Sequence, residues 1–255
     1  MKQKLLSWGL VKYELRNLIG NPFIVFFGFV FPILMSVLLS VTTTKQVPET
    51  VRSQVITSLF ITMSMIGPLA IILIGYAVNY SQELENDIPL RMKLFGFRER
   101  SILLAKMMAQ LIGVTVALLI YTIVDFILLD IQTPTLTSAL CLIISLYILS
   151  AVLFILAHGI ATLFRKFGPT YAVTMILYFF ILILTGMMGI TVDQMPKVLN
   201  YIAKALPMTY ISNDYVDFWQ GGSYNFVPFI QSLLLLAAVS GIVLIVSLRR
   251  NRRTS

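Results

Sequence analysis

Residues 55–78 read VITSLFITMSMIGPLAIILIGYAV, a run without one charged side chain. A helix needs about 20 mainly apolar residues to cross the hydrocarbon core of a bilayer, so this run predicts a membrane-spanning helix. Similar runs lie at 22–41, 107–129, 136–164, 171–190 and 226–248. The sequence therefore predicts an all-α integral membrane protein with six transmembrane helices. Pro32 and Pro68 lie inside the first two runs and predict kinks there.

The composition excludes an ordinary soluble fold. Hydrophobic residues make up 58% of the 255 residues and charged residues only 12%, whereas soluble domains carry about 25% charged residues. The net charge of +8 does not indicate a partner nucleic acid, because the basic residues are spread over four loops and form no single patch. Cys141 is the one cysteine, which excludes a disulfide within the chain.

The distribution of basic residues predicts the orientation. The segments before the first run, between the second and third, between the fourth and fifth, and after the sixth hold 15 of the 19 Lys and Arg residues. Cytoplasmic loops carry an excess of basic residues. We therefore expect a multi-pass protein of the cell (plasma) membrane with both termini in the cytoplasm and the lipid bilayer as a partner.

Residues 1–21 precede the first run and predict a helix that lies on the membrane surface. Within residues 5–19, Trp8, Val11, Leu15 and Leu18 share one helical face, whereas Glu14 lies opposite. An amphipathic helix that carries a tryptophan suits the interface between lipid and water. The alternative is that the segment extends the first span.

Residues 81–106 read SQELENDIPLRMKLFGFRERSILLAK and form the sizeable loop on the predicted cytoplasmic side. Apolar and charged residues mixed in this way are typical of a docking surface, although the charges could also serve only to set the topology. Gly96 is expected to separate a short helix from a turn before the third span. The residues predicted to couple to a partner are Glu83, Glu85, Arg91, Phe95, Phe97 and Arg98.

Residues 191–222 lie on the predicted outer side and contain two apolar patterns, each too short to span a membrane. The first is a stripe at helical spacing from Met195 to Leu206, and the second runs from Tyr210 to Trp219. We expect a pair of short helices that dip into the outer leaflet or cap the bundle. The residues expected to form an outer gate are Pro196, Leu199, Ile202, Pro207 and Tyr210.

Several of these stretches resemble the membrane subunit of an ABC-2 type ABC transporter. The family has a glycine at the end of span five, and Leu184-Thr185-Gly186 is similar to it. A Pro-led short helix follows in the family, as in MPKVL at 195–199, and then Pro-x-Thr-Tyr, as in LPMTY at 206–210. ELENDI at 83–88 with Lys106 resembles its coupling region, although Asp87 and Ile88 replace a common Gly-Thr, and Gly96 a common proline.

The resemblance covers essentially the whole chain and implies one ABC-2 type transmembrane domain over 1–255. Within it, 1–21 would be an interfacial connecting helix, 81–106 a cytoplasmic coupling region with its coupling helix, and 191–222 an outer re-entrant pair between spans five and six. Two such subunits, identical or related, would form a dimer in the transport unit.

Family membership also implies an ATPase partner. The chain lacks the phosphate-binding pattern G-x-x-x-x-G-K-[ST], so ATP and Mg²⁺ are expected on a separate nucleotide-binding subunit. This chain is expected to bind no cofactor or metal and to carry no catalytic residue. The predicted function is the transmembrane subunit of an ATP-driven exporter for an amphipathic or hydrophobic substrate, such as a drug, a peptide antibiotic, a lipid or a glycan.

Two other classes of protein are alternatives. An ion-driven secondary transporter would show several buried charges or matching broken helices, and a membrane-embedded enzyme would need a nucleophile with a base, or a metal cluster. Neither pattern is evident in the sequence.

Some residues inside the spans are candidates for function. Asp125, near the outer end of the third span, is expected at a hydrated interface, and His158 is expected to pack against or hydrogen-bond to a neighbouring helix. A substrate path could be lined by Met63, Tyr76, Phe179 and Met187, although such residues more commonly pack or face lipid.

Overall fold

A computed structural model of the chain describes residues 7–45, 47–189 and 192–254. Six helices in this part are long and apolar enough to cross a membrane, as the sequence predicted. They are α2–η1–α3 (Pro22–Val25, Phe26–Val30, Phe31–Thr44), α4–α5–η2–α6 (Glu49–Met63, Ile66–Pro68, Leu69–Tyr76, Ala77–Glu85), α8 (Glu99–Leu128), α9 (Leu136–Phe164), α10 (Phe167–Leu184) and α13 (Phe226–Thr254).

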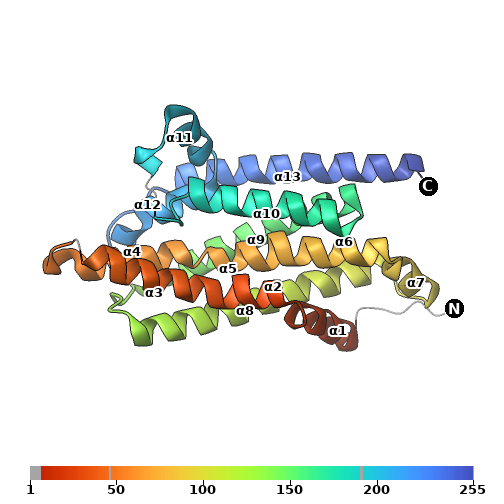
Figure 1. Cartoon of the computed structure of the whole chain (residues 1–255), viewed down its shortest axis with the longest axis horizontal. Helices are drawn as coiled ribbons and strands as arrows, with labels where there is room; N and C mark the ends of the chain where they lie inside the picture. The colour runs from red at the N-terminus through yellow and green to blue at the C-terminus, as the bar shows by residue number, and fades with distance from the viewer. Residues whose placement is uncertain (1–6, 46, 190–191, 255) are drawn as a thin grey trace.

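Five short elements lie outside these spans: α1 (Trp8–Ile19), α7 (Ile88–Leu94), η3 (Val192–Gln194), α11 (Lys197–Lys204) and α12 (Pro207–Trp219). Figure 1 shows an elongated bundle with α1, α7 and the C-terminal end of α13 at one end, which we call the N/C end. The short helices α11 and α12 and the turn between α3 and α4 lie at the opposite end, which we call the far end.

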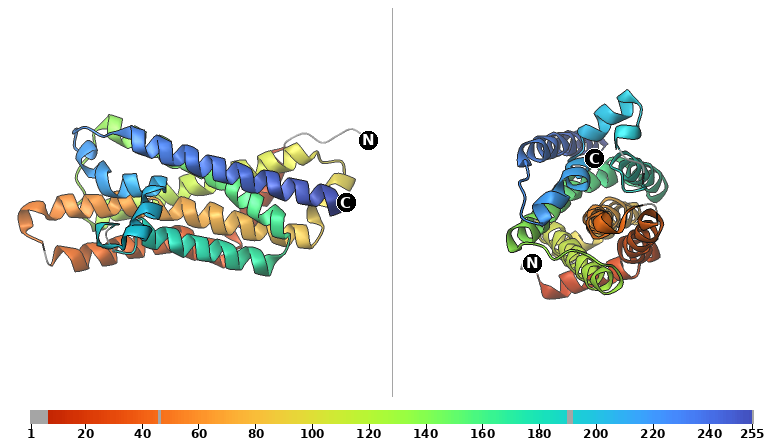
Figure 2. Two further views of the ribbon diagram at one scale, coloured as in Figure 1. Left: turned by 90° about the horizontal axis from the view of Figure 1, so that it is seen from above. Right: turned by 90° about the vertical axis from the view of Figure 1, so that its left-hand side faces the viewer.

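The second span is the most enclosed part of the bundle. Its most apolar window is 78% buried, against 17–50% for the other spans, and the end view in Figure 2 shows it towards the middle of the helices. Met63, Met65, Ile66 and Leu69 have no exposed surface. The hydrophobic core therefore surrounds this span, while the remaining spans keep one face free for lipid.

Close contact between the first two spans depends on glycine. A Cβ atom added at Gly28 would lie 2.6 Å from Cγ1 of Ile71, and one added at Gly75 would lie 2.5 Å from Cδ1 of Ile24. Such distances are shorter than van der Waals contact, so a larger residue at either position would force the helices apart.

Both intraspan prolines adjoin stretches of π-helix. Residues Phe26–Val30 precede Pro32, and residues Leu69–Tyr76 follow Pro68. Proline has no backbone N–H and cannot continue the regular i→i−4 pattern, and π-type bonding takes up the mismatch. Each span continues through its proline as one helix, and the predicted kinks stay a prediction.

Several helices end at other residues than the apolar runs predicted as spans. The second span begins at Glu49 instead of residue 55 and ends at Glu85, the third begins at Glu99 instead of 107, and the fifth ends at Leu184 instead of 190. Backbone hydrogen bonding continues a helix beyond its apolar residues, whereas the apolar runs mark only the part that suits hydrocarbon. Residue 190 itself lies outside the described residues.

Two short helices occupy the far end, as predicted for 191–222, and Thr191 alone of that segment lies outside the described residues. Helix α12 is anchored to the loop before α9 and to the first turn of α9. Trp219 donates its indole N–H to the backbone oxygen of Gln132 at 2.7 Å, and the Tyr215 hydroxyl donates to that of Ser138 at 2.7 Å. Whether the pair re-enters the bilayer stays a prediction.

Candidate functional site

A buried group of charges joins three helices at the N/C end. Nζ of Lys106, on α8, lies 2.9 Å from both carboxylate oxygens of Glu14, on α1, and 2.6 Å from Oε2 of Glu83, on α6. The three side chains are between 3% and 8% exposed. We call this group the Lys106 cluster; it connects the helix before the first span to spans two and three.

The cluster carries two acids and one base, so one negative charge is left uncompensated when all three groups are ionised. Burial raises the pKa of Glu14 to about 6, the positive charge of Lys106 opposes this rise, and the charge of Glu83 adds to it. Lys106 donates hydrogen bonds to Glu14, whereas its short contact with Glu83 Oε2 is an ion pair without hydrogen-bond alignment. Glu14 is therefore the better-satisfied partner.

Apolar packing next to the cluster joins α7 to the same helices. Leu10 and Val11 of α1 contact Ile102, Ala105 and Ala109 of α8, and the partly buried side chains of Met92 and Phe97 pack against this group. Movement of the α7 region is therefore linked to both α1 and α8.

Helix α7 also presents an apolar surface that the described part of this chain leaves exposed. Leu90, Leu94 and Phe95 are 56%, 71% and 69% exposed. The helix follows Asp87, whose φ of 54° is left-handed, and the turn after it uses Gly96 with a φ of 90°. These two turns set α7 apart from the ends of α6 and α8, and Gly96 separates helix from turn as predicted.

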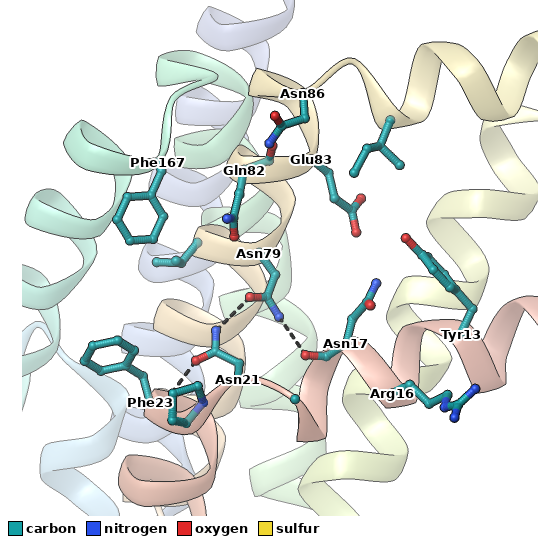
Figure 3. Close-up of a pocket in the computed structure, with 14 residues that line it drawn as sticks. Tyr13, Arg16, Asn17, Asn21, Phe23, Asn79, Gln82, Glu83, Asn86 and Phe167 are labelled. Carbon is teal, nitrogen blue, oxygen red and sulfur yellow. Dashed lines mark hydrogen bonds between the residues drawn. The ribbon is translucent and has the colours of Figure 1, made fainter.

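A polar groove of about 490 Å³ opens beside α1 at the same end. Figure 3 shows the side chains of Asn17, Asn21, Asn79 and Gln82 together in it, with Phe23 and Phe167 at one side. Asn21 donates from Nδ2 to Oδ1 of Asn79 at 2.7 Å, and Asn79 donates to the backbone oxygen of Asn17 at 3.5 Å. The groove is thus lined by carboxamides, which both donate and accept hydrogen bonds.

Comparison with protein families places the chain. Residues 39–249 match the family model described as "ABC-2 family transporter protein". The chain belongs to the ABC-2 transporter family. A comparison with curated proteins found no match. The matched region of this ABC-2 permease contains Glu83, Lys106, α7, α11 and α12, whereas α1 with Glu14 precedes it.

The residues predicted to couple the permease to an ATPase lie in different environments. Glu83 is buried in the Lys106 cluster, and Glu85 accepts a hydrogen bond from the backbone N–H of Phe167 at 2.8 Å. Arg91 donates to the backbone oxygen of Asn86 at 3.0 Å. Phe95 is exposed, Phe97 is partly buried, and Arg98 stands at the N-cap of α8. They do not form one continuous surface.

The predicted outer gate residues lie on α11 and α12 or at their starts. Pro196 is the N-cap of α11, and Pro207 is the first residue of α12. Leu199 packs with Leu184 and Val192 against the end of span five, while Ile202 is 39% exposed. The Tyr210 hydroxyl donates to the backbone oxygen of Lys204 at 2.8 Å, which ties the two helices together.

The residues predicted for a substrate path are mainly part of the core. Met63 and Met187 have no exposed surface, and Tyr76 is 2% exposed. Phe179 is 36% exposed and lies near Phe27 and Tyr178. Three of the four side chains therefore face protein within this single chain.

The predicted environments of three polar residues agree with the structure to different degrees. A 2.7 Å hydrogen bond joins Nδ1 of His158 to the Tyr76 hydroxyl. This confirms the predicted hydrogen bond of His158 to another helix. Glu14 was expected to lie opposite the apolar face, yet it is buried, because α1 is covered by α8 and α6 on that side as well. Asp125 was expected at a hydrated interface, and this was wrong: it has no exposed surface.

Proposed function

We propose that this ABC-2 permease is the transmembrane subunit of an ATP-driven exporter. The N/C end would face the cytoplasm of the cell and receive a separate nucleotide-binding subunit there. Three observations support this: family membership, the concentration of 15 of the 19 basic residues in the four segments predicted to be cytoplasmic, and the lack of a phosphate-binding loop in the chain. The described parts of these four segments lie at the N/C end (Figure 1).

The observation that carries the proposal is the exposed apolar face of α7. Leu94 and Phe95 are about 70% exposed on a short helix that stands at the N/C end (Figure 1). Interfaces draw their affinity from a few large apolar or aromatic side chains that fill pockets of the partner. A subunit that binds these side chains would hold α7 directly.

The surroundings of α7 explain how the force would travel. Asn86 and Asp87 alone separate α7 from α6, and residues 95–98 alone separate it from α8. These short connections leave α7 little freedom to move without the second and third spans. The Lys106 cluster then holds α6 and α8 to α1, because separating its charges would leave at least one buried and unpaired.

The transport pathway would lie between two permease subunits. Met63, Tyr76 and Met187 are buried within one chain, so a path that used them would require the helices to move, whereas a second subunit would enclose a path without repacking the core. The carboxamide groove would receive the polar part of an amphipathic substrate at the inner membrane surface, beside the apolar ring of Phe23. This arrangement suits export of an amphipathic molecule.

Replacing Leu94 and Phe95 together by alanine tests the docking site. We expect the purified variant to lose its copurifying ATPase subunit, identified by its phosphate-binding loop, and the associated ATP hydrolysis. Val198→Ala with Tyr201→Ala is the matched control, because these side chains are 71% and 75% exposed at the far end. The control should keep the complex.

Two results would contradict the proposal. Full copurification and ATP hydrolysis in the Leu94→Ala, Phe95→Ala variant would place the docking site elsewhere. A wild-type chain that purifies from its native membrane without any ATPase, yet transports in response to an ion gradient, would instead support the ion-driven class.

A further inference from the structure

Asp125 is a buried acid whose charge is not balanced by any described residue. It lies on α8, one turn beyond Tyr121 and near the far end, and its exposed fraction is 0%. Neither Oδ1 nor Oδ2 has a hydrogen-bond partner within the described residues. Buried polar atoms are nearly always paired, so this carboxyl group requires an explanation.

The neighbouring groups are hydroxyls. Ser36 and Ser40 lie one turn apart on the buried face of α3, and their Oγ atoms also lack partners among the residues described. The hydroxyls of Ser36 and Tyr121 are close enough to act on the Asp125 carboxyl, but outside hydrogen-bond geometry. The Tyr121 hydroxyl donates instead to the backbone oxygen of Phe60, on α4, at 2.8 Å.

Among the residues that the structure describes, no positive charge offsets an ionised Asp125. The titratable group that faces it from its own helix is Tyr121, α3 contributes serines, and α4 contributes Phe60. Helix α9 brings Tyr147, which pairs with Thr115 nearer the N/C end. Among the far-end charged groups whose side chains the structure describes, Arg52 is partly exposed and the others are exposed: Lys45, Glu49, Asp130, Lys197, Lys204, Asp214 and Asp217.

Two kinds of ligand could remove the charge: a proton or a metal cation. Hard cations require six or more oxygen ligands, and the described residues contain no group of three His, Cys, Asp or Glu that could hold a metal ion. A proton requires no cavity and converts one carboxylate oxygen into a donor for Ser36. An ionised carboxylate with no partner is costly in a low-dielectric interior.

We infer that Asp125 is a proton-binding site between the first and third spans. The carboxyl group is neutral while α3 and α8 are packed together, and it can release its proton to water only when these helices separate at the far end. Binding and release are a simple exchange, in which COO⁻ takes up H⁺ to give COOH. The site would make the α3–α8 contact sensitive to protons, independently of where an ATPase docks.

Infrared spectroscopy of the purified full chain in lipid nanodiscs tests this directly. At about pH 8, two units above the pKa of about 6 of Glu14, the wild-type chain should still show the C=O stretching band of a protonated carboxylic acid. The band should shift in D₂O and disappear in Asp125→Asn, which keeps the shape of the side chain. Glu14→Gln should retain it and serves as the matched control.

A second variant keeps the test valid if Asp125→Asn fails to fold. Ser36→Ala removes one of the two neighbouring hydroxyls and should shift the frequency of the band without abolishing it. A wild-type chain with no protonated-acid band at this pH would overturn the inference and show that the carboxylate is ionised. A band that persists unchanged in both Asp125→Asn and Ser36→Ala would also overturn it, because the protonated acid would then be another residue.

Discussion

Glu14 shows how a single buried acid can set the pH dependence of stability. Its pKa rises from 4.5 to about 6, so the folded chain binds more protons than the unfolded chain between these values. The stability that Glu14 contributes should therefore be fully present below about pH 4.5 and be lost as the pH rises through 6. The shift corresponds to about 2 kcal/mol.

Thermal unfolding of the purified chain between these pH values measures the effect. The wild-type melting temperature should fall with rising pH, and Glu14→Gln should remove most of the slope because the amide does not titrate. Lys12→Gln on the exposed face of the same helix is the control and should leave the slope intact. A wild-type melting temperature that rises over this range would contradict the assignment.

The contacts of individual residues in the Lys106 cluster were harder to predict from the sequence than the spans. The position of Lys106 at the head of the third span followed from the resemblance, but its pairing with Glu14 did not. A helical wheel assigns a residue to a face and assumes that only the apolar face is covered, whereas α1 is contacted on more than one side. Asp125 was misplaced for a similar reason: distance from the end of a span does not show whether a neighbouring helix covers it.

At the level of elements, the close approach of spans one and two makes a specific prediction. Gly28→Ala places a methyl group 2.6 Å from the fully buried Ile71, and overpacking of this kind costs about 1–3 kcal/mol. Gly241→Ala is the matched control in α13, because no atom lies within 4 Å of its added Cβ. It should be neutral or stabilise the chain by up to about 1 kcal/mol, since alanine favours helix.

Melting temperatures of the two variants in the same detergent compare them directly. Gly28→Ala should melt at a lower temperature than wild type, and Gly241→Ala at an equal or higher one. An equal decrease of the melting temperature in both variants would contradict this, because it would show that glycine is needed for flexibility and not for space.

The elements themselves could be predicted from the apolar runs, but their ends and the π-helical stretches could not. The existence of each span depends on a local property, the hydropathy of about 20 successive residues. The π-helical stretches next to Pro32 and Pro68 depend on how neighbouring helices accommodate a missing hydrogen bond, which is not a local property. The two short far-end helices were predictable because prolines mark their starts.

For the whole molecule, the arrangement in Figure 1 predicts which positions share a side of the membrane. In a Cys141→Ser background, Thr133→Cys and Ser223→Cys at the far end should react with an impermeant thiol reagent added to intact cells. Arg100→Cys, exposed at the N/C end, should react only after the membrane is opened. Labelling of Arg100→Cys in intact cells would reverse the proposed orientation.

The enclosed position of span two has a consequence for biosynthesis. The first span contacts it and precedes it in the chain, but α9, α10 and α12, which also cover it, follow it and are synthesised later. When residues 49–85 leave the ribosome, the later helices have not yet been synthesised. Those helices therefore offer no surface to Thr57, Thr62 and Ser64, which are all buried in the finished protein. Insertion and packing must therefore be separate events for this span. A truncated nascent chain would expose to lipid, or to the insertion machinery, the surface that the mature permease hides most completely.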